Sequence, residues 1–376
     1  MARVAVVHNT LDLRGGADAV CLHACEALSR DHDVTLLTLS HPPLSTLDDL
    51  FDTDTRGVRV ETPTVGRVSE RLFAAVPPDQ VGPQLPFWSL LLQRSLRRRR
   101  GEFDLVVSTA NEFAVPGPSV QYVHYPQFRR HVDDEGSVAD RLWSRLAVSE
   151  GVPSDARLLA NSSYTARAVE RRYGRESTVL HPPVDPIEGE TAWADREDGV
   201  VVLGRLAPDK RTLAALSVVD RVRERGHDLS VHVVGTAAPA YREYAQRVES
   251  AAADRPHATL HGAVSRDRLE ALLTSTKYGL SAKPGEHFGM AVAEFVAAGM
   301  VAFAPDSGGQ RDVLDGDPDR LYDSPADAAV TIAAAVDRGD RPRLRRDRFA
   351  RDRFHDRLRA VVEAALPAAA RRRHTT

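Results

Sequence analysis

Short apolar runs alternate with amphipathic helical patterns along the first half of this chain. The predicted strands are residues 3–8, 33–39, 57–61, 103–108, 119–123, 157–160 and 178–180. Helical patterns lie between them, notably over residues 17–29 and 162–173. Strands that alternate with helices in this way predict a doubly wound α/β domain with a parallel sheet.

The same alternation starts again in the second half. Predicted strands cover residues 200–204, 229–234, 258–260, 278–282 and 301–304, with helices ending at 226 and covering 239–253, 265–274 and 288–299. Between the halves, Pro182, Pro183, Pro186 and the acidic stretch 188–198 suit neither kind of element, so we predict the linker there. The resulting domains are residues 1–184 and 185–345, followed by an arginine-rich, amphipathic tail over 346–376.

Two glutamates eight positions apart are the most informative feature of the second domain. Glu286 lies in a polar turn just before a helix predicted to begin near Phe288, and Glu294 lies about 8 Å further along the axis. The free N–H groups of residues 288–290 are donors for hydroxyl or phosphate oxygens. Together these groups could hold an extended polyhydroxylated ligand. The alternative is an acidic helix start followed by a solvent-facing glutamate.

Two cations follow the first strand of the second domain. Arg205 and Lys210 come after the apolar run 200–204, at the end of the sheet where ligands gather in open α/β folds. A guanidinium fork and an ammonium point charge can together neutralise a pyrophosphate. The alternative is that Asp209 caps a helix beside two solvated cations.

The first domain offers a glycine pair and a histidine. Gly15 and Gly16 have no Cβ, so the backbone there can approach a phosphate or an acceptor; alternatively they only end a loop before the helix. His124 follows an apolar strand, where a lone histidine is more often structural. Asn161 and Ser162 precede a helix and are expected mainly to cap it.

Composition narrows the class of protein. The 376 residues suit two domains, and 42% hydrophobic with 27% charged residues is ordinary for a globular protein. A net charge of −3 excludes a typical nucleic-acid-binding domain. The two cysteines, Cys21 and Cys25, are expected to be buried small hydrophobes. We find no apolar stretch of about 18 residues and no signal-peptide pattern, which predicts a soluble, cytoplasmic protein.

Other patterns in the sequence argue against further classes of protein. There is no G-x-G-x-x-G after the first strand and no P-loop, which argues against dinucleotide oxidoreductases and P-loop ATPases. Asp52-Thr53-Asp54 lies in a polar turn and is expected at the surface, not at a catalytic metal. The apolar stretch 85–96 and the four arginines after it either pack against the sheet or rest on anionic lipid.

The motifs resemble those of retaining glycosyltransferases of family 4, which have the GT-B fold. The matching strings are Gly15-Gly16-Ala17-Asp18, Gly204-Arg205-Leu206 with Lys210, Glu286 to Glu294 with Phe288-Gly289, and Ser307-Gly308-Gly309. GT-B implies two Rossmann-like domains facing across a cleft, with the last helix crossing back onto the first domain.

Further strings resemble one subgroup, the GDP-mannose-dependent mannosyltransferases that extend dolichol-linked oligosaccharides. They are Tyr122-Val123-His124-Tyr125-Pro126, Ala160-Asn161-Ser162-Ser163, His181-Pro182-Pro183-Val184-Asp185 and Glu286-His287-Phe288-Gly289. The chain departs from this subgroup at Arg205, where the eukaryotic enzymes carry glutamine.

The resemblance implies a role for each motif residue. Arg205 and Lys210 would stabilise the departing nucleoside diphosphate without a metal ion, Glu294 would bind the ribose, and Glu286 and His124 would contact the sugar. Backbone groups of Phe288, Gly289 and Met290 would also touch the sugar, and loops at Gly235 and Val264 would contact the base. Arg129 and Arg130 are candidates for an acceptor phosphate.

The implied reaction transfers a hexose, in the first instance mannose from GDP-mannose, to a lipid-linked or polysaccharide-precursor glycan with an α-glycosidic product. Such an acceptor would bring the enzyme to the inner face of a membrane as a peripheral protein. Alternatives are a UDP-sugar donor, a GT-B phosphorylase or epimerase, and a non-catalytic sugar-nucleotide-binding module. The sequence gives no oligomeric state.

Overall fold

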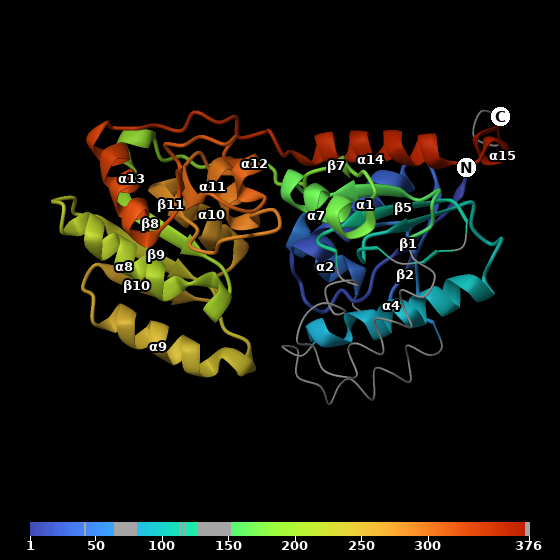
Figure 1. The fold of residues 1–376 in the computed structure, drawn as a ribbon, viewed down its shortest axis with the longest axis horizontal. Helices are drawn as coiled ribbons and strands as arrows, with labels where there is room; N and C mark the ends of the chain where they lie inside the picture. Colours follow the sequence, from blue (N-terminus) through green and yellow to red (C-terminus); the bar gives the residue numbers. More distant parts are fainter. Residues whose placement is uncertain (41–42, 64–80, 113, 116, 127–151, 373–376) are drawn as a thin grey trace. The chain divides into compact units, whose positions relative to one another are not determined.

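The computed structural model describes residues 1–40, 43–63, 81–112, 114–115, 117–126 and 152–372. The chain forms two compact units. Unit 1 comprises Met1–Pro183 and Arg351–Thr376, and unit 2 comprises Val184–Ala350. In each unit, helices cover both faces of a parallel sheet (Figure 1). These sheets confirm the two doubly wound domains predicted from the alternating pattern.

Unit 1 has a seven-stranded sheet in the order β3-β2-β1-β4-β5-β6-β7. Its strands are β1 (Arg3–Val7), β2 (Asp33–Leu37), β3 (Arg59–Glu61), β4 (Leu105–Ser108), β5 (Ser119–Val123), β6 (Arg157–Ala160) and β7 (Thr178–Val179). The helices of unit 1 within the described residues are α1 (Gly16–Ser29), α2 (Leu44–Phe51), α4 (Val81–Arg98), α7 (Ser163–Tyr173), α14 (Arg351–Ala365) and α15 (Ala368–Arg372).

Side chains of β1 alternate between two cores, as expected for a strand buried on both faces. Val4 and Val6 join the core under α1 and α14, whereas Ala5 and Val7 join the core under α4. The apolar stripe Phe354, Leu358 and Val362 of α14 completes the first core.

Helix α4 contains the apolar stretch 85–96, for which the sequence allowed either packing against the sheet or contact with lipid. Leu91, Leu92 and Leu96 are buried against strand residues of the sheet, so this part of α4 packs on it. The side chains of Phe87 and Trp88, and the pair Arg129 and Arg130, lie outside what the structure describes.

Unit 2 has a six-stranded sheet in the order β10-β9-β8-β11-β12-β13. Its strands are β8 (Glu197–Leu203), β9 (Ser230–Val234), β10 (Ala258–Gly262), β11 (Thr276–Leu280), β12 (Val301–Pro305) and β13 (Leu321–Tyr322). Its α-helices are α8 (Thr212–Arg223), α9 (Arg242–Ala253), α10 (Arg266–Ser275), α11 (Met290–Ala297), α12 (Gln310–Val313) and α13 (Pro325–Asp337). Val200 and Val202 face one core and Val201 the other.

Two sequence predictions need correction here. The helix after Glu286 begins at Met290, not near Phe288, because Gly289 adopts φ +104° as its N-cap and holds the preceding residues in a loop. The acidic linker was predicted to run to residue 198, yet β8 begins at Glu197. Glu197 fits a strand end because its carboxylate accepts from Ser230 and His232 on β9.

Three smaller predictions are confirmed. Cys21 and Cys25 are buried in the core of unit 1. Asp52 and Asp54 lie at the surface, with side chains 88% and 48% exposed. Ser162 caps α7 by accepting a hydrogen bond from the Thr165 N–H at 3.1 Å.

Among the helices that the structure describes, none has both the length and the apolar content needed to cross a membrane.

Candidate active site

The strand order of unit 2 reverses direction at β8, whose neighbours β9 and β11 continue the sheet in opposite senses. In open parallel sheets, ligands bind outside the carboxyl ends of the strands at such a switch point. The segment 204–210 follows β8 and the segment 281–289 follows β11. The sheet topology therefore brings the two predicted motifs of this unit to the same crevice.

Lys210 and Glu286 meet there in an ion pair between Nζ and Oε1. Lys283 lies beside them, with Nζ 3.6 Å from Glu286 Oε2 and 2.9 Å from Asp209 Oδ2. Counting the exposed Arg205, three cations surround two carboxylates, which leaves one net positive charge. Such a cluster can accept an anionic group in exchange for part of its internal pairing.

The electrostatic field of these cations is visible at Asp209. Burial raises the pKa of this carboxyl, but the hydrogen bond from Lys283 and the charges of Lys283, Arg205 and Lys210 outweigh it and lower the pKa below its ordinary value. Asp209 therefore stays ionised and holds Lys283 at the crevice. Arg205 and Lys210 thus act on the same small region, as their spacing predicted.

The loop that carries Glu286 is fixed from the turn after β12. The Gly309 N–H donates to the Glu286 carbonyl at 2.7 Å, and the Gly285 N–H donates to Ser307 Oγ at 3.0 Å. At Gly308, where φ is +79°, a Cβ would lie 2.4 Å from the Glu286 carbonyl oxygen. The Ser-Gly-Gly turn therefore positions Glu286, because only glycine permits this approach.

Gln310 supports the same loop and was not singled out in the sequence. Its buried amide donates to the carbonyls of Lys283 at 3.1 Å and Pro305 at 3.2 Å, and it accepts from Ser281 Oγ at 3.3 Å. A Cβ on Gly289 would lie 3.0 Å from that of Gln310. A glutamine directly after the Ser-Gly-Gly turn is the sequence signal that could have pointed to it.

Glu294 has different partners from Glu286. Its Oε1 accepts from Arg266 of α10 at 2.6 Å, and Arg266 also binds Glu270 at 2.7 Å. Burial raises the pKa of Glu294, while Arg266 opposes this rise. The carboxylate is thus held in place by a cation that the sequence did not reveal, since α10 carries no recognisable motif.

The remaining predicted donor-binding residues of unit 2 differ in their surroundings. Phe288 is buried, and its ring lies edge-on to Phe349 at 5.4 Å, so its side chain packs in the core. Met290 and Val264 are partly buried against the same core. Gly235, with φ +143°, allows β8 and β9 to end side by side, because a Cβ there would lie 1.9 Å from the Gly204 carbonyl oxygen.

In unit 1 the strand order reverses at β1, between its neighbours β2 and β4. His8 follows β1, and its Nδ1 lies 3.0 Å from Thr109 Oγ1 after β4. Its Nε2 lies 3.0 Å from Asp18 Oδ1 of α1. Asp18 Oδ2 accepts from the Gly15 N–H at 3.2 Å. His8 and Asp18 therefore anchor the glycine loop.

The two predicted glycines of that loop lie at the start of α1. Gly15 is the N-cap of α1 with φ −107°, and a Cβ on it would meet no described atom within 4 Å. Gly16 is the first residue of the helix. The packing of unit 1 therefore does not itself require glycine at position 15.

His124 lies at the carboxyl end of β5, on the same edge of the sheet. Its Nε2 is 3.1 Å from the Thr109 carbonyl, and its N–H donates to Asn111 Oδ1 at 2.6 Å. Asn161 donates to the His124 carbonyl at 3.0 Å. Because His8 also contacts the Thr109 carbonyl, at 3.2 Å, a continuous set of hydrogen bonds joins His124 to the glycine loop. The sequence did not reveal His8, Thr109 or Asn111.

Comparison with protein families gives the chain its class. The family model described as "Glycosyltransferase Family 4" matches residues 14–188, and "Glycosyl transferases group 1" matches residues 185–338. The chain belongs to glycosyltransferase family 4, and its two parallel-sheet units are those of the GT-B fold.

Curated relatives resemble part of the chain. GDP-Man:Man(3)GlcNAc(2)-PP-Dol alpha-1,2-mannosyltransferase of Candida glabrata is 25% identical over 166 residues, 40% of this chain and 33% of the relative. The protein of the same description from Dictyostelium discoideum is 24% identical over 176 residues, 41% of this chain and 35% of the relative. The match thus spans about a third of each relative's length.

Solved structures share the fold at low identity. Anabaena Alr3699/HepE, solved with UDP and glucose, superposes with a TM-score of 0.64 at 13% identity and covers 99% of this chain and 98% of its own. WaaG, a glycosyltransferase involved in lipopolysaccharide biosynthesis, has a TM-score of 0.62 at 13% identity, with 96% and 95% covered. At this identity the likeness concerns the fold alone.

Proposed function

We propose that this protein transfers a hexose from a nucleotide diphosphate sugar to a glycan acceptor with retention at the anomeric carbon. The cationic cluster of Arg205, Lys210 and Lys283 around Glu286, at the switch point of unit 2, carries this proposal. A nucleotide sugar offers a pyrophosphate for the cations and a polyhydroxylated ring for the carboxylate. The curated relatives that act from GDP-mannose support mannose as the sugar.

The cluster would act mainly in the transition state. As the glycosidic bond to the pyrophosphate breaks, negative charge grows on the departing phosphate oxygen, and Lys210 and Arg205 stabilise it. This is the electrostatic task that a divalent metal performs in other transferases. The acceptor oxygen attacks from the same face and gives its proton to that phosphate oxygen, so the product is an α-glycoside.

Each carboxylate takes a separate part of the donor. Glu294, held by Arg266, binds the ribose hydroxyls, and Glu286, held by the Ser307-Gly308-Gly309 turn, binds the sugar hydroxyls. Backbone groups of Phe288, Gly289 and Met290 contact the sugar between them. In unit 1, Gly15 and Gly16 are the candidates for contact with the phosphates or the acceptor, and His124 is the candidate for contact with the transferred sugar. The loops at Gly235 and Val264 meet the base.

The acceptor is a lipid-linked or polysaccharide-precursor glycan, which places the enzyme at the cytoplasmic surface of a membrane. Two alternatives are a UDP-sugar transferase, and a phosphorylase or epimerase on the same fold. Transfer of label from the donor to an added mannosyl glycan distinguishes a transferase from a phosphorylase or an epimerase. The donor screen below distinguishes GDP-mannose from a UDP-sugar.

A donor screen tests the proposal most directly. GDP-mannose, UDP-glucose, UDP-N-acetylglucosamine and ADP-glucose are compared by thermal shift at equal concentration, with Lys210→Ala as the control for the site. A ligand about hundredfold above its Kd stabilises the native state by about 2.7 kcal/mol, or roughly 2–4 °C. GDP-mannose should give the largest shift. A larger shift with a UDP-sugar would overturn the mannose assignment and leave family membership intact.

Transfer should also proceed in excess chelator, because Arg205 and Lys210 supply the positive charge. The measurement is the initial rate of product formation with and without EDTA, followed by addition of Mg²⁺ or Mn²⁺. Activity that is lost in EDTA and restored specifically by Mg²⁺ or Mn²⁺ would contradict metal-free transfer.

A further inference from the structure

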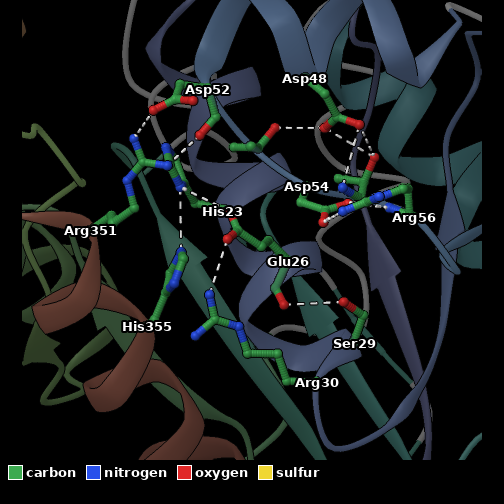
Figure 2. A network of polar contacts seen from close by, with 12 residues as sticks. His23, Glu26, Ser29, Arg30, Asp48, Asp52, Asp54, Arg56, Arg351 and His355 are labelled. Carbon is green, nitrogen blue, oxygen red and sulfur yellow. Dashed lines mark hydrogen bonds and ion pairs between the residues drawn. The ribbon is translucent and has the colours of Figure 1, made fainter.

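A second polar cluster lies in the interior of unit 1, away from the carboxyl edge of the sheet. His23 and Glu26 stand one turn apart on α1, and His355 of α14 faces them (Figure 2). All three residues are buried, at 5%, 8% and 1% exposure. Among the residues that the structure describes, they form one group of ligand-type side chains whose donor atoms all lie within 4.8 Å of one another.

The distances fit a small metal ion. His23 Nδ1 is 3.4 Å from His355 Nε2 and 3.8 Å from Glu26 Oε2. In a tetrahedral zinc site with bonds of about 2.0–2.1 Å, neighbouring ligand atoms lie roughly 3.3–3.4 Å apart. The two imidazoles thus already stand at the required separation, and Glu26 has a flexible side chain to close the third side.

Glu26 provides an independent reason to place a cation here. Its Oε1 accepts from Arg30 at 3.1 Å, which orients the carboxylate. Its Oε2 is buried without a hydrogen-bond donor and is directed at the histidines. Buried carboxylate oxygens are normally satisfied by donors or by metal ions. Arg30 then plays the part of an outer hydrogen-bond partner that fixes a ligating carboxylate.

We infer that His23, Glu26 and His355 form a binding site for a divalent transition-metal ion, Zn²⁺ in the first instance. Two imidazoles and a carboxylate are ligands that suit Zn²⁺, with a water molecule as the fourth. The ion joins α1 to α14 and so fastens α14 to the rest of unit 1. The site is separate from sugar transfer, because Glu26 lies ten residues, about 15 Å, along α1 from Gly16 at its start.

Zinc binding to the full-length, untagged protein tests the inference. The protein is stripped with a chelator, exchanged into chelator-free buffer and titrated with ZnCl₂ against a chromophoric competitor. We expect one Zn²⁺ per chain with a Kd of about 1 µM or tighter. Zn²⁺ should raise the unfolding temperature of unit 1 by roughly 2–4 °C at about hundredfold excess over its Kd. Absence of binding at this level overturns the inference.

Variants assign the ion to this cluster. His355→Gln and Glu26→Gln should each weaken Zn²⁺ binding by at least about tenfold. His32→Gln is the matched control, because His32 lies just after α1 and also pairs with α14, through Glu363 at 3.2 Å, but lies outside the cluster. His261→Gln tests the other close histidine pair, His232 and His261, which stand 3.1 Å apart in unit 2. Loss of binding in His261→Gln alone contradicts the site.

X-ray absorption on the zinc-loaded wild type decides the matter even if a variant fails to fold. Two imidazole ligands and additional oxygen ligands are expected. A shell of oxygen alone, or any sulfur from Cys21 or Cys25, would overturn the assignment. If His23 and His355 share only an N–H···N hydrogen bond, the protein binds no zinc and the titration shows it.

Discussion

The two units place different chemistry at equivalent positions of the same sheet topology. In both, the strand order reverses at the first strand of the sheet, and the loops after the first and fourth strands meet at the crevice. Unit 1 fills this position with the buried pair His8 and Asp18, whereas unit 2 fills it with the partly exposed pair Lys210 and Glu286. The crevice of unit 1 holds a backbone loop in place, whereas the charges at the crevice of unit 2 remain accessible to solvent.

The difference shows in the protonation of His8. Burial lowers the pKa of His8, but Cys21, Asp18 and the Thr109 carbonyl raise it by a larger amount. The resulting pKa is about 9, above the ordinary value for histidine. A buried imidazolium that donates to Asp18 and to Thr109 satisfies both ring nitrogens. In unit 2 the corresponding charges keep access to solvent, so they can exchange partners when an anion arrives. Perturbing each pair should therefore affect a different property.

The largest effect is expected from Asp18→Asn, which leaves His8 buried without its counter-charge. Breaking a buried ion pair costs about 3–5 kcal/mol, so the free energy of unfolding of unit 1 should fall by about that amount. Urea unfolding followed by a probe in unit 1 measures it, with the exposed Asp49→Asn as control. A loss below about 1 kcal/mol, as is typical of an exposed pair, would remove the contrast between the units.

Lys210→Ala should reduce activity and leave stability almost unchanged. Removing a preorganised group that stabilises transition-state charge reduces kcat by about 10²–10³-fold, while stability should change little because Lys283 still pairs with Glu286. Lys277→Ala is the matched control. Lys277 belongs to the same unit and pairs with Asp198 at 2.8 Å, but this pair lies at the amino-terminal ends of β11 and β8, opposite to the crevice. Equal losses of activity in both variants would contradict the role of Lys210.

Substitutions of Glu294 and Glu286 should weaken the binding of different ligands. Glu294→Ala should weaken binding of plain nucleotide by about 10- to 150-fold, because hydrogen bonds to a charged group contribute about 1.5–3 kcal/mol. Glu286→Ala should spare the nucleotide and weaken the intact sugar donor. Calorimetry with GDP and GDP-mannose measures both. Glu270→Ala is the control, since it also removes a partner of Arg266; if it matches Glu294→Ala, then Glu294 acts only by holding Arg266.

The smallest effect concerns acid stability. Because the pKa of Asp209 is lowered in the folded state, its contribution is fully present above the unfolded value of about 3.9 and is lost as pH falls through the folded value. The contribution should stay below about 1 kcal/mol, since the side chain is 44% exposed. The stability difference between wild type and Asp209→Asn should therefore shrink below about pH 4 in urea unfolding. A difference that widens in acid would reverse the sign.

The sequence predicted the fold well because both units depend on regular alternation of apolar strands and amphipathic helices. It also placed Lys210 and Glu286 at the crevice, since motifs that directly follow strands inherit their position from the sheet. It could not reveal Arg266 or His8. Both contact the predicted residues through tertiary packing, from α10 and from the end of β1, and neither belongs to a local pattern.

For the same reason, the sequence could predict neither the exact start of a helix nor the residues that the C-terminal tail contacts. Gly289 ends the loop by adopting a positive φ, which a pattern of apolar positions does not record, and the helix start was misplaced by two residues. Nor does the amphipathic pattern of the tail show that His355 meets His23. Pairings across hundreds of residues depend on which face each helix buries.

The position of α14 has a consequence for biosynthesis. This helix fills the core of unit 1, yet the ribosome makes it only after all of unit 2. At about 5–20 residues per second, the incomplete unit 1 waits for the 167 residues of Val184–Ala350, roughly 8–33 s, with the surface meant for Phe354 and Leu358 uncovered. Unit 2 is continuous in the chain and can fold first. We therefore expect unit 2 to complete its core before unit 1 does, so that apolar surface of the N-terminal half stays exposed for longer during synthesis.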